Sequence, residues 1–121
     1  MKLEFAEHEA VPRPPGEVRF LRITADPYED GRRIKLAYEL TPFQKRPSLE
    51  IRMEDEHGVD LGSILIIESM SPRFALTAHL RTESPAIGRV LVRSVLGYED
   101  QPEVDRAVTP VDFGAPRLRE G

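Results

Sequence analysis

The segment Arg33-Ile34-Lys35-Leu36-Ala37-Tyr38-Glu39-Leu40 decides the fold. Its even-numbered residues are large and mainly apolar and its odd-numbered residues are charged or small, which is the two-residue period of a strand that buries one face. Residues 49–54 repeat this alternation, and residues 73–81 form a third segment of the same kind. We expect the core to contain Ile34, Leu36, Tyr38, Leu49, Ile51, Met53, Phe74, Leu76 and Leu80.

Four further segments complete the predicted strands. Residues 59–68 are continuously apolar at their centre, which indicates a strand covered on both faces, and Gly62 marks a bulge. Residues 90–98 also fit a helix face, but their valines and flanking glycines favour a strand. Residues 18–25 change phase at Phe20-Leu21, which suggests a bulge or a strand that switches sheets, and Pro110 makes residues 104–113 an edge strand.

The connections are rich in proline and glycine. Eleven prolines are spread along the chain, so long helices have few places to form. Residues 26–31 and 55–58 are predicted turns, and residues 41–47 are expected to link strands of different sheets. At the ends we expect a short edge strand and a polyproline II lead within residues 1–16, and a flexible tail at residues 114–121.

These strands and turns predict an all-β domain spanning residues 1–121. Seven to eight short strands with turn signals every 8–12 residues indicate a two-sheet antiparallel β-sandwich. The strand order and the proline-rich lead into the first strand are similar to a fibronectin type III or related immunoglobulin-like module. The chain has no tryptophan, although a buried tryptophan is common in such modules.

Composition limits the classes of partner. The net charge of −4 predicts no nucleic-acid or membrane partner. We interpret the densest basic stretch as a solvated or salt-bridged face; it contains Arg32, Arg33, Lys35, Lys45 and Arg46. No apolar run approaches the roughly 20 residues that span a bilayer, and zero cysteines fit a reducing compartment, so a cytoplasmic location is expected. The chain has no asparagine and only three lysines, which fits either a thermophilic source or genome base composition.

No motif identifies a catalytic residue, a cofactor, a metal ligand or a small-molecule site. His8, His57 and His79 lie on separate segments, and no serine occupies a G-x-S-x-G elbow. Acidic residues do gather in predicted loops, so a Ca²⁺-dependent ligand- or membrane-binding sandwich is one alternative. A small enzyme whose site the sequence does not reveal is a second alternative.

An apolar surplus is the feature that a solitary sandwich explains least well. The run Ile64-Leu65-Ile66-Ile67 places large residues on both faces of one strand, and Leu91 and Val95 oppose two valines in another. The surplus is expected to be covered by the N-terminal segment at residues 2–15, by a long loop, or by another chain. We expect a non-catalytic binding or assembly module, a homo-oligomer or a protein bound to a partner, with an interface formed by Leu65, Ile67, Leu91 and Val95.

Overall fold

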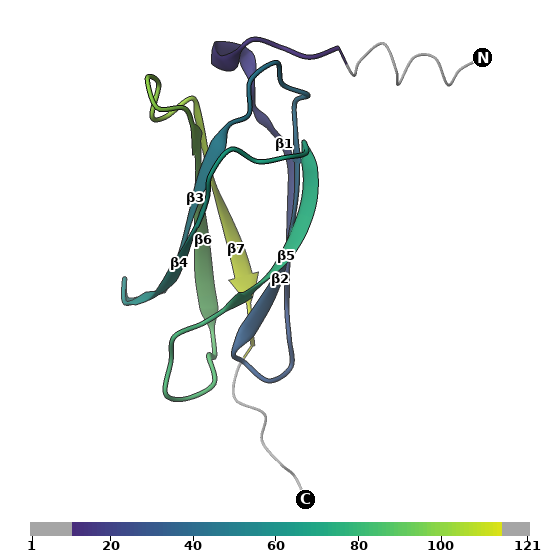
Figure 1. The fold of residues 1–121 in the computed structure, drawn as a ribbon. Coiled ribbons are helices and arrows are strands. Elements are labelled where there is room, and N and C mark those ends of the chain that lie inside the picture. The colour runs from purple at the N-terminus through teal and green to yellow at the C-terminus, as the bar shows by residue number, and fades with distance from the viewer. Residues whose placement is uncertain (1–10, 115–121) are drawn as a thin grey trace, which may run out of the picture.

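The computed structural model describes residues 11–114, and these fold into two antiparallel β-sheets packed face to face (Figure 1). The strands are β1 (Phe20–Pro27), β2 (Arg33–Leu40), β3 (Ser48–Asp55), β4 (Asp60–Ile66), β5 (Arg73–His79), β6 (Arg89–Gly97) and β7 (Asp105–Asp112). One sheet has the order β1-β2-β5 and the other β4-β3-β6-β7. In this range the only helical segment is the single 3₁₀ turn η1 (Pro15–Glu17), and no helix is long and apolar enough to cross a bilayer.

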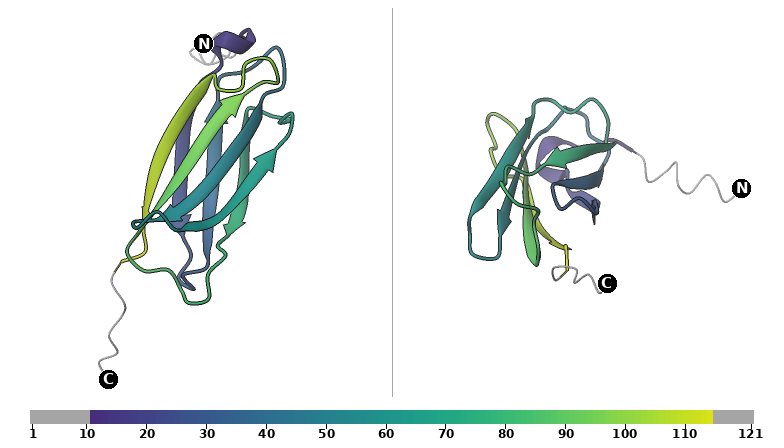
Figure 2. Two further views of the ribbon diagram at one scale, coloured as in Figure 1. Left: turned by 90° about the vertical axis from the view of Figure 1, so that its left-hand side faces the viewer. Right: turned by 90° about the horizontal axis from the view of Figure 1, so that it is seen from below.

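The strand order confirms the predicted immunoglobulin-like sandwich. In the constant-type immunoglobulin arrangement the fourth strand pairs with the fifth. Here β4 pairs with β3 instead, so that it forms an edge of the four-stranded sheet, as Figure 2 shows from the side of that sheet. The linker from β2 to β3 crosses between the two sheets, as the prolines in residues 41–47 predict.

The pairing of the strands confirms most of the local predictions about bulges, strands and edges. The ladder between β1 and β2 shifts between Phe20 and Arg22, which makes the predicted change of phase a bulge. The ladder between β3 and β4 shifts next to Gly62, whose φ of 130° lies in a region that L side chains rarely adopt. Residues 89–97 form a strand rather than a helix, and Pro110 lies on the edge strand β7.

The core lies between the sheets and is centred on β2, β3 and β6. Six of the nine predicted core residues are at most 2% exposed and Leu80 is 7% exposed, while Phe74 and Leu76 are half-buried against the same cluster. The ring of Tyr38 stacks on that of Phe74, with centroids 5.3 Å apart, and its hydroxyl is 2.8 Å from the Ser94 hydroxyl on the opposite sheet. Buried residues outside the predicted set include Val18, Leu40, Leu61, Ala78, Val90, Val92, Leu96 and Val111.

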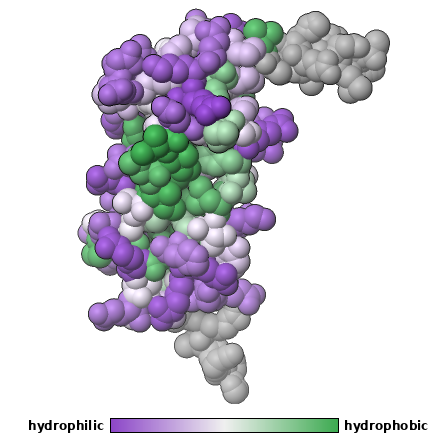
Figure 3. Space-filling view, viewed as in Figure 1, coloured by the Kyte–Doolittle hydropathy of each residue, from purple (hydrophilic) through white to green (hydrophobic). Residues whose placement is uncertain are grey.

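The two lateral sides of the sandwich differ. On one side β1 packs along β7, and the backbone N–H of Phe20 donates to the Asp105 carboxylate at 2.9 Å. On the other side, between β4 and β5, four inward-facing apolar residues are only half-buried: Ile64, Ile66, Phe74 and Leu76. We call this the open side, and Figure 3 shows a hydrophobic patch at the middle of it.

Two sequence predictions need correction. Residues 59–68 are not covered on both faces: β4 is an edge strand, and Leu65 on its outer face is 64% exposed. The lead at residues 11–16 is not polyproline II throughout, because it bends into η1 at Pro15. The predicted edge strand at residues 2–5 and almost all of the predicted tail lie outside the described residues.

Candidate functional site: a groove beside the edge strand β4

The candidate site begins with the outer face of β4. Alternation along this strand directs Ile64 and Ile66 toward the core and Leu65 toward solvent, and Ile67 follows directly after the strand. Leu65 is 64% and Ile67 69% exposed, although both belong to a run of four aliphatic residues. No other part of the described chain covers them.

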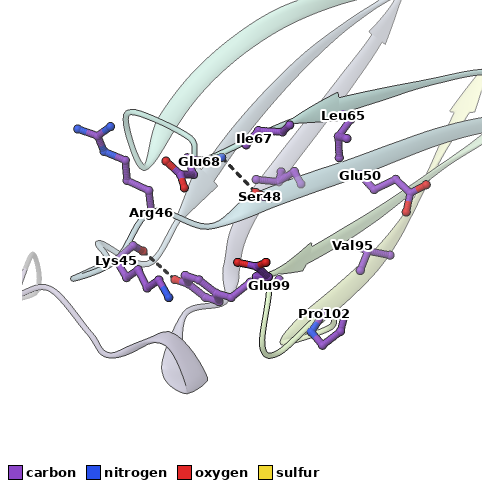
Figure 4. Close-up of a pocket in the computed structure, with 13 residues that line it drawn as sticks. Lys45, Arg46, Ser48, Glu50, Leu65, Ile67, Glu68, Val95, Glu99 and Pro102 are labelled. Atoms are coloured by element: carbon purple, nitrogen blue, oxygen red, sulfur yellow. Dashed lines mark hydrogen bonds between the residues drawn. The ribbon is translucent and has the colours of Figure 1, made fainter.

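A shallow groove of about 420 Å³ lies along these side chains (Figure 4). Its walls come from β4, from the start of β3, and from the ends of β6 and of the β2–β3 linker. The Tyr98 hydroxyl donates to the Lys45 carbonyl at 2.9 Å, and the Glu68 backbone N–H donates to the Ser48 hydroxyl at 3.1 Å. These two bonds hold the linker and the end of β4 in place. Burial raises the pKa of Tyr98 above its ordinary value of 10.0.

Two backbone features shape the groove. Glu68 has a φ of 53°, the left-handed region that favours glycine, and this turns the chain sharply away from β4 after Ile67. Gly97 lies where the β6–β7 loop crosses close to the end of β6, so that a Cβ there would stand 2.0 Å from the Pro102 carbonyl oxygen. The groove therefore depends on a strained residue on one wall and on a glycine at its floor.

Charges of both signs surround the apolar floor. Lys45 extends over the Tyr98 ring with its ammonium 5.7 Å from the ring centroid, and Arg46 is exposed beside it. Glu68 and Glu99 also line the groove. The arrangement suits an apolar group that is flanked by both kinds of charge rather than a simple anion or cation.

Three of the four predicted interface residues meet at this groove. Leu65, Ile67 and Val95 all line it. Across the sheet, however, Glu50 stands between Leu65 and Val95, because it pairs with both of them. Leu91 projects from the same face of β6 but lies between Glu54 and Pro110 in the ladders, outside the groove.

Sequence reasoning missed the groove walls and the open side. The contributions of Tyr98 and Glu68 depend on a linker and on a backbone conformation that no local pattern shows. Phe74 and Leu76 were expected in the core, and their half-exposure follows from the separation of β4 and β5. A hint was present in the two consecutive apolar edge strands, neither of which carries a charge or a proline in its interior.

Carboxylates in two of the acidic loops accept hydrogen bonds from backbone N–H groups of their own turns. The Asp55 carboxylate accepts the backbone N–H groups of Val59 and His57, and the Asp30 carboxylate accepts the N–H of Arg32. In both cases these hydrogen bonds hold the pKa of the carboxyl group below its ordinary value. The loops at 26–31 and 55–60 share one end of the sandwich, and the loop at 99–105 is at the other. Within residues 11–114 no three His, Cys, Asp or Glu side chains are grouped to hold a metal ion.

Two of the three histidines and the start of the basic stretch lie within the described residues. His57 lies in the β3–β4 turn and His79 on the exposed face of β5, while His8 is outside the described range. Arg33 bonds the Asp30 carboxylate at 2.9 Å and stacks on the Tyr28 ring, and Arg32 donates to the carbonyls of residues 82 and 83. The start of the basic stretch is therefore a salt-bridged face.

Comparison with known proteins identifies the architecture. No protein-family model matches the chain, and no curated protein matches it in sequence. Among solved structures, a glycosyl hydrolase family 2 member from Bacteroides cellulosilyticus DSM 14838 is similar with a TM-score of 0.56 and 12% identity, over 79% of this chain and 15% of that chain. A putative beta-galactosidase from Bacteroides fragilis gives a TM-score of 0.53 at 16% identity, over 81% of this chain and 16% of that one.

A third neighbour, beta-glucuronidase 3 from Bacteroides uniformis, has a TM-score of 0.50 and 16% identity, over 77% of this chain and 12% of that chain. The described domain is a β-sandwich of the kind found within these enzymes. The chain spans less than a fifth of the length of each neighbour, and identities this low establish the fold alone. The groove and the open side are therefore the features of this chain from which a function can be inferred.

Proposed function

We propose that this chain is a non-catalytic assembly module that binds a second copy of itself through the surface of β4. The observation that supports the proposal is the exposure of Leu65 and Ile67, at 64% and 69%, beside a groove that the described chain leaves open. Fully burying a Leu or Ile side chain stabilises by about 1.5–3 kcal/mol. Two such residues in each copy supply several kcal/mol toward association.

The β4 surface is compatible with a second copy as its occupant. Residues 61–67 contain no charged side chain, so two copies of this segment can meet without placing like charges opposite each other. A two-fold axis across β4 presents the same apolar segment from each copy to the other, and such an interface is self-complementary. A cytoplasmic setting is part of this proposal.

Light scattering coupled to size-exclusion chromatography tests the proposal at micromolar concentration. We expect the parent chain to elute at twice its 13.7 kDa mass, and Leu65→Glu and Ile67→Lys to elute as folded monomers. Ile87→Lys is the matched control, because Ile87 is also exposed, at 53%, but lies in the β5–β6 loop.

The possible outcomes separate cleanly. A monomer mass for the parent chain ends the proposal, whatever else binds the groove. A dimer that survives both β4 variants, or one that Ile87→Lys also dissociates, shows that the association uses another surface. Circular dichroism of each variant confirms that a monomer mass reflects lost association rather than unfolding.

A further inference from the structure

The edge of β4 is less protected than the edges of β1 and β7. Edge strands expose unpaired backbone groups, and proteins guard them with bulges, prolines, charges or covering segments. The edges of β1 and β7 lie against each other, and they carry the Phe20–Arg22 bulge and Pro110. By contrast, residues 63–67, which are the second half of edge strand β4 and the residue after it, contain no charge, proline or bulge.

Hydrogen bonds at the two ends of β3, together with the alternation along each strand, show which backbone groups of β4 face away from β3. Pro47 and Asp55, at the two ends of β3, both hydrogen-bond toward the β4 side, through Ser69 N–H and the Val59 carbonyl. The odd-numbered residues of β3 therefore direct their backbone groups to β4, and their partners there include Ile64 and Ile66. Consequently Ser63 and Leu65 direct their N–H and C=O groups outward.

One bond fixes where this free edge begins. The Leu61 carbonyl already accepts the Arg81 N–H at 2.7 Å, so the outward side of β4 is occupied there by the chain that follows β5. Beyond Leu61 the outward groups of residues 63–67 have no such partner in the described chain. Five residues of free edge coincide with the exposed side chains of Leu65 and Ile67.

We propose that two copies join edge to edge, with β4 of one antiparallel to β4 of the other about a two-fold axis at Leu65, so that their four-stranded sheets become one continuous sheet. This inference rests on the proposed self-association and specifies its geometry. On the axis, Leu65 faces its counterpart and exchanges two hydrogen bonds with it, and Ser63 exchanges two with Ile67 at each side. Ile64 then lies opposite Ile66, which extends the apolar row across the open side.

Stacking of the outer sheet faces is the competing geometry, and the charges oppose it. On that face β3 presents Glu50, Arg52 and Glu54, and β6 presents Arg93 between Leu91 and Val95. These groups pair with one another, as in the 2.8 Å bond from Arg93 to Glu54, but stacking would remove them from water. Burying such pairs costs more than their mutual attraction usually returns. Edge pairing leaves them solvated.

Proline substitution distinguishes the two geometries. Ser63→Pro removes an outward N–H and leaves the apolar side chains in place, and proline is tolerated on an edge whose N–H faces solvent. We expect folded Ser63→Pro to be monomeric at concentrations where the parent chain is dimeric, with association at least tenfold weaker. Ser63→Ala is the control that keeps the N–H, and Val108→Glu introduces a charge at the exposed outer face of β7; both should remain dimeric.

Amide hydrogen exchange provides the second readout, and it requires no folded proline variant. We expect the amides of Ser63, Leu65 and Ile67 to exchange slowly in concentrated parent chain and rapidly after dilution below the dissociation constant. If the parent chain dimerises but Ser63→Pro remains dimeric, or these amides exchange alike at both concentrations, edge pairing is wrong while self-association stands. If the parent chain is a monomer, both fail, and slow exchange in that monomer assigns the edge to another segment of the same chain.

Discussion

Replacing Tyr38 or Ser94 tests whether one buried hydrogen bond joins the two sheets. The two hydroxyls are 2.8 Å apart, their residues are 2% and 1% exposed, and no buried side-chain polar atom in the described chain lacks a partner. Tyr38→Phe leaves the Ser94 hydroxyl without its partner, and Ser94→Ala does the same to the tyrosine, so each should cost about 1–3 kcal/mol. The double variant should cost less than the sum, because removing both partners leaves nothing unsatisfied.

Thermal and urea unfolding of the parent, the single variants and the double variant measure this coupling. For a domain of this size, 1 kcal/mol shifts the melting temperature by about 3–6 °C. Each single variant should therefore melt several degrees below the parent, with the double variant close to the less stable single. If the two single effects simply add, the hydroxyls do not interact, and the pairing of the sheets at this point is wrong.

Alkaline pH gives an independent measure of the same group. Burial raises the pKa of Tyr38 to about 12, against an ordinary value of 10.0, although the bond to Ser94 partly offsets this. The unfolded chain then loses the phenolic proton first, so the free energy of unfolding falls as pH rises from 10 to 12, by about 2–3 kcal/mol in all. Tyr38→Phe should lack this component. Equal pH dependence of the parent and Tyr38→Phe between pH 10 and 12 would contradict the burial.

Four further tests concern the backbone, the packing of the β6–β7 loop, the core and metal dependence. Glu68→Gly should stabilise by about 0.5–1 kcal/mol in urea unfolding, because the φ of 53° suits glycine, and a loss of stability would show that the Glu68 side chain matters more. Gly97→Ala should destabilise by about 1–3 kcal/mol by overpacking against Pro102, and a melting temperature equal to the parent's would mean that the β6–β7 loop moves aside. Leu36→Ala should cost about 2–5 kcal/mol, and a parent-like melt would place Leu36 outside the core. EDTA or Ca²⁺ should leave the melting temperature unchanged, since saturation at 100-fold above Kd adds about 2.7 kcal/mol and would appear as a shift of several degrees.

The strands were predictable because each carries its own evidence. In β2 and β3 the alternation of apolar and charged residues indicates which face of the strand is buried. The structure places both strands in the interior of their sheets. Pro110 and Gly62 likewise act locally, one by lacking an N–H and the other by tolerating a φ of 130°. The apolar run of β4 was ambiguous, because four consecutive aliphatic residues fit a central strand and an exposed edge equally well.

Sequence alone thus determined the strand positions, most core faces and the presence of an apolar surplus around Leu65 and Ile67. Tertiary structure decided where that surplus lies, because only the pairing of β4 with β3 makes it an edge and only the gap between β4 and β5 leaves the open side uncovered. It also separated Leu91 from Val95 and brought Tyr98 to the Lys45 carbonyl. The physical reason is range: alternation is a property of neighbouring residues, whereas edges, grooves and cross-sheet bonds arise from contacts between segments distant along the chain.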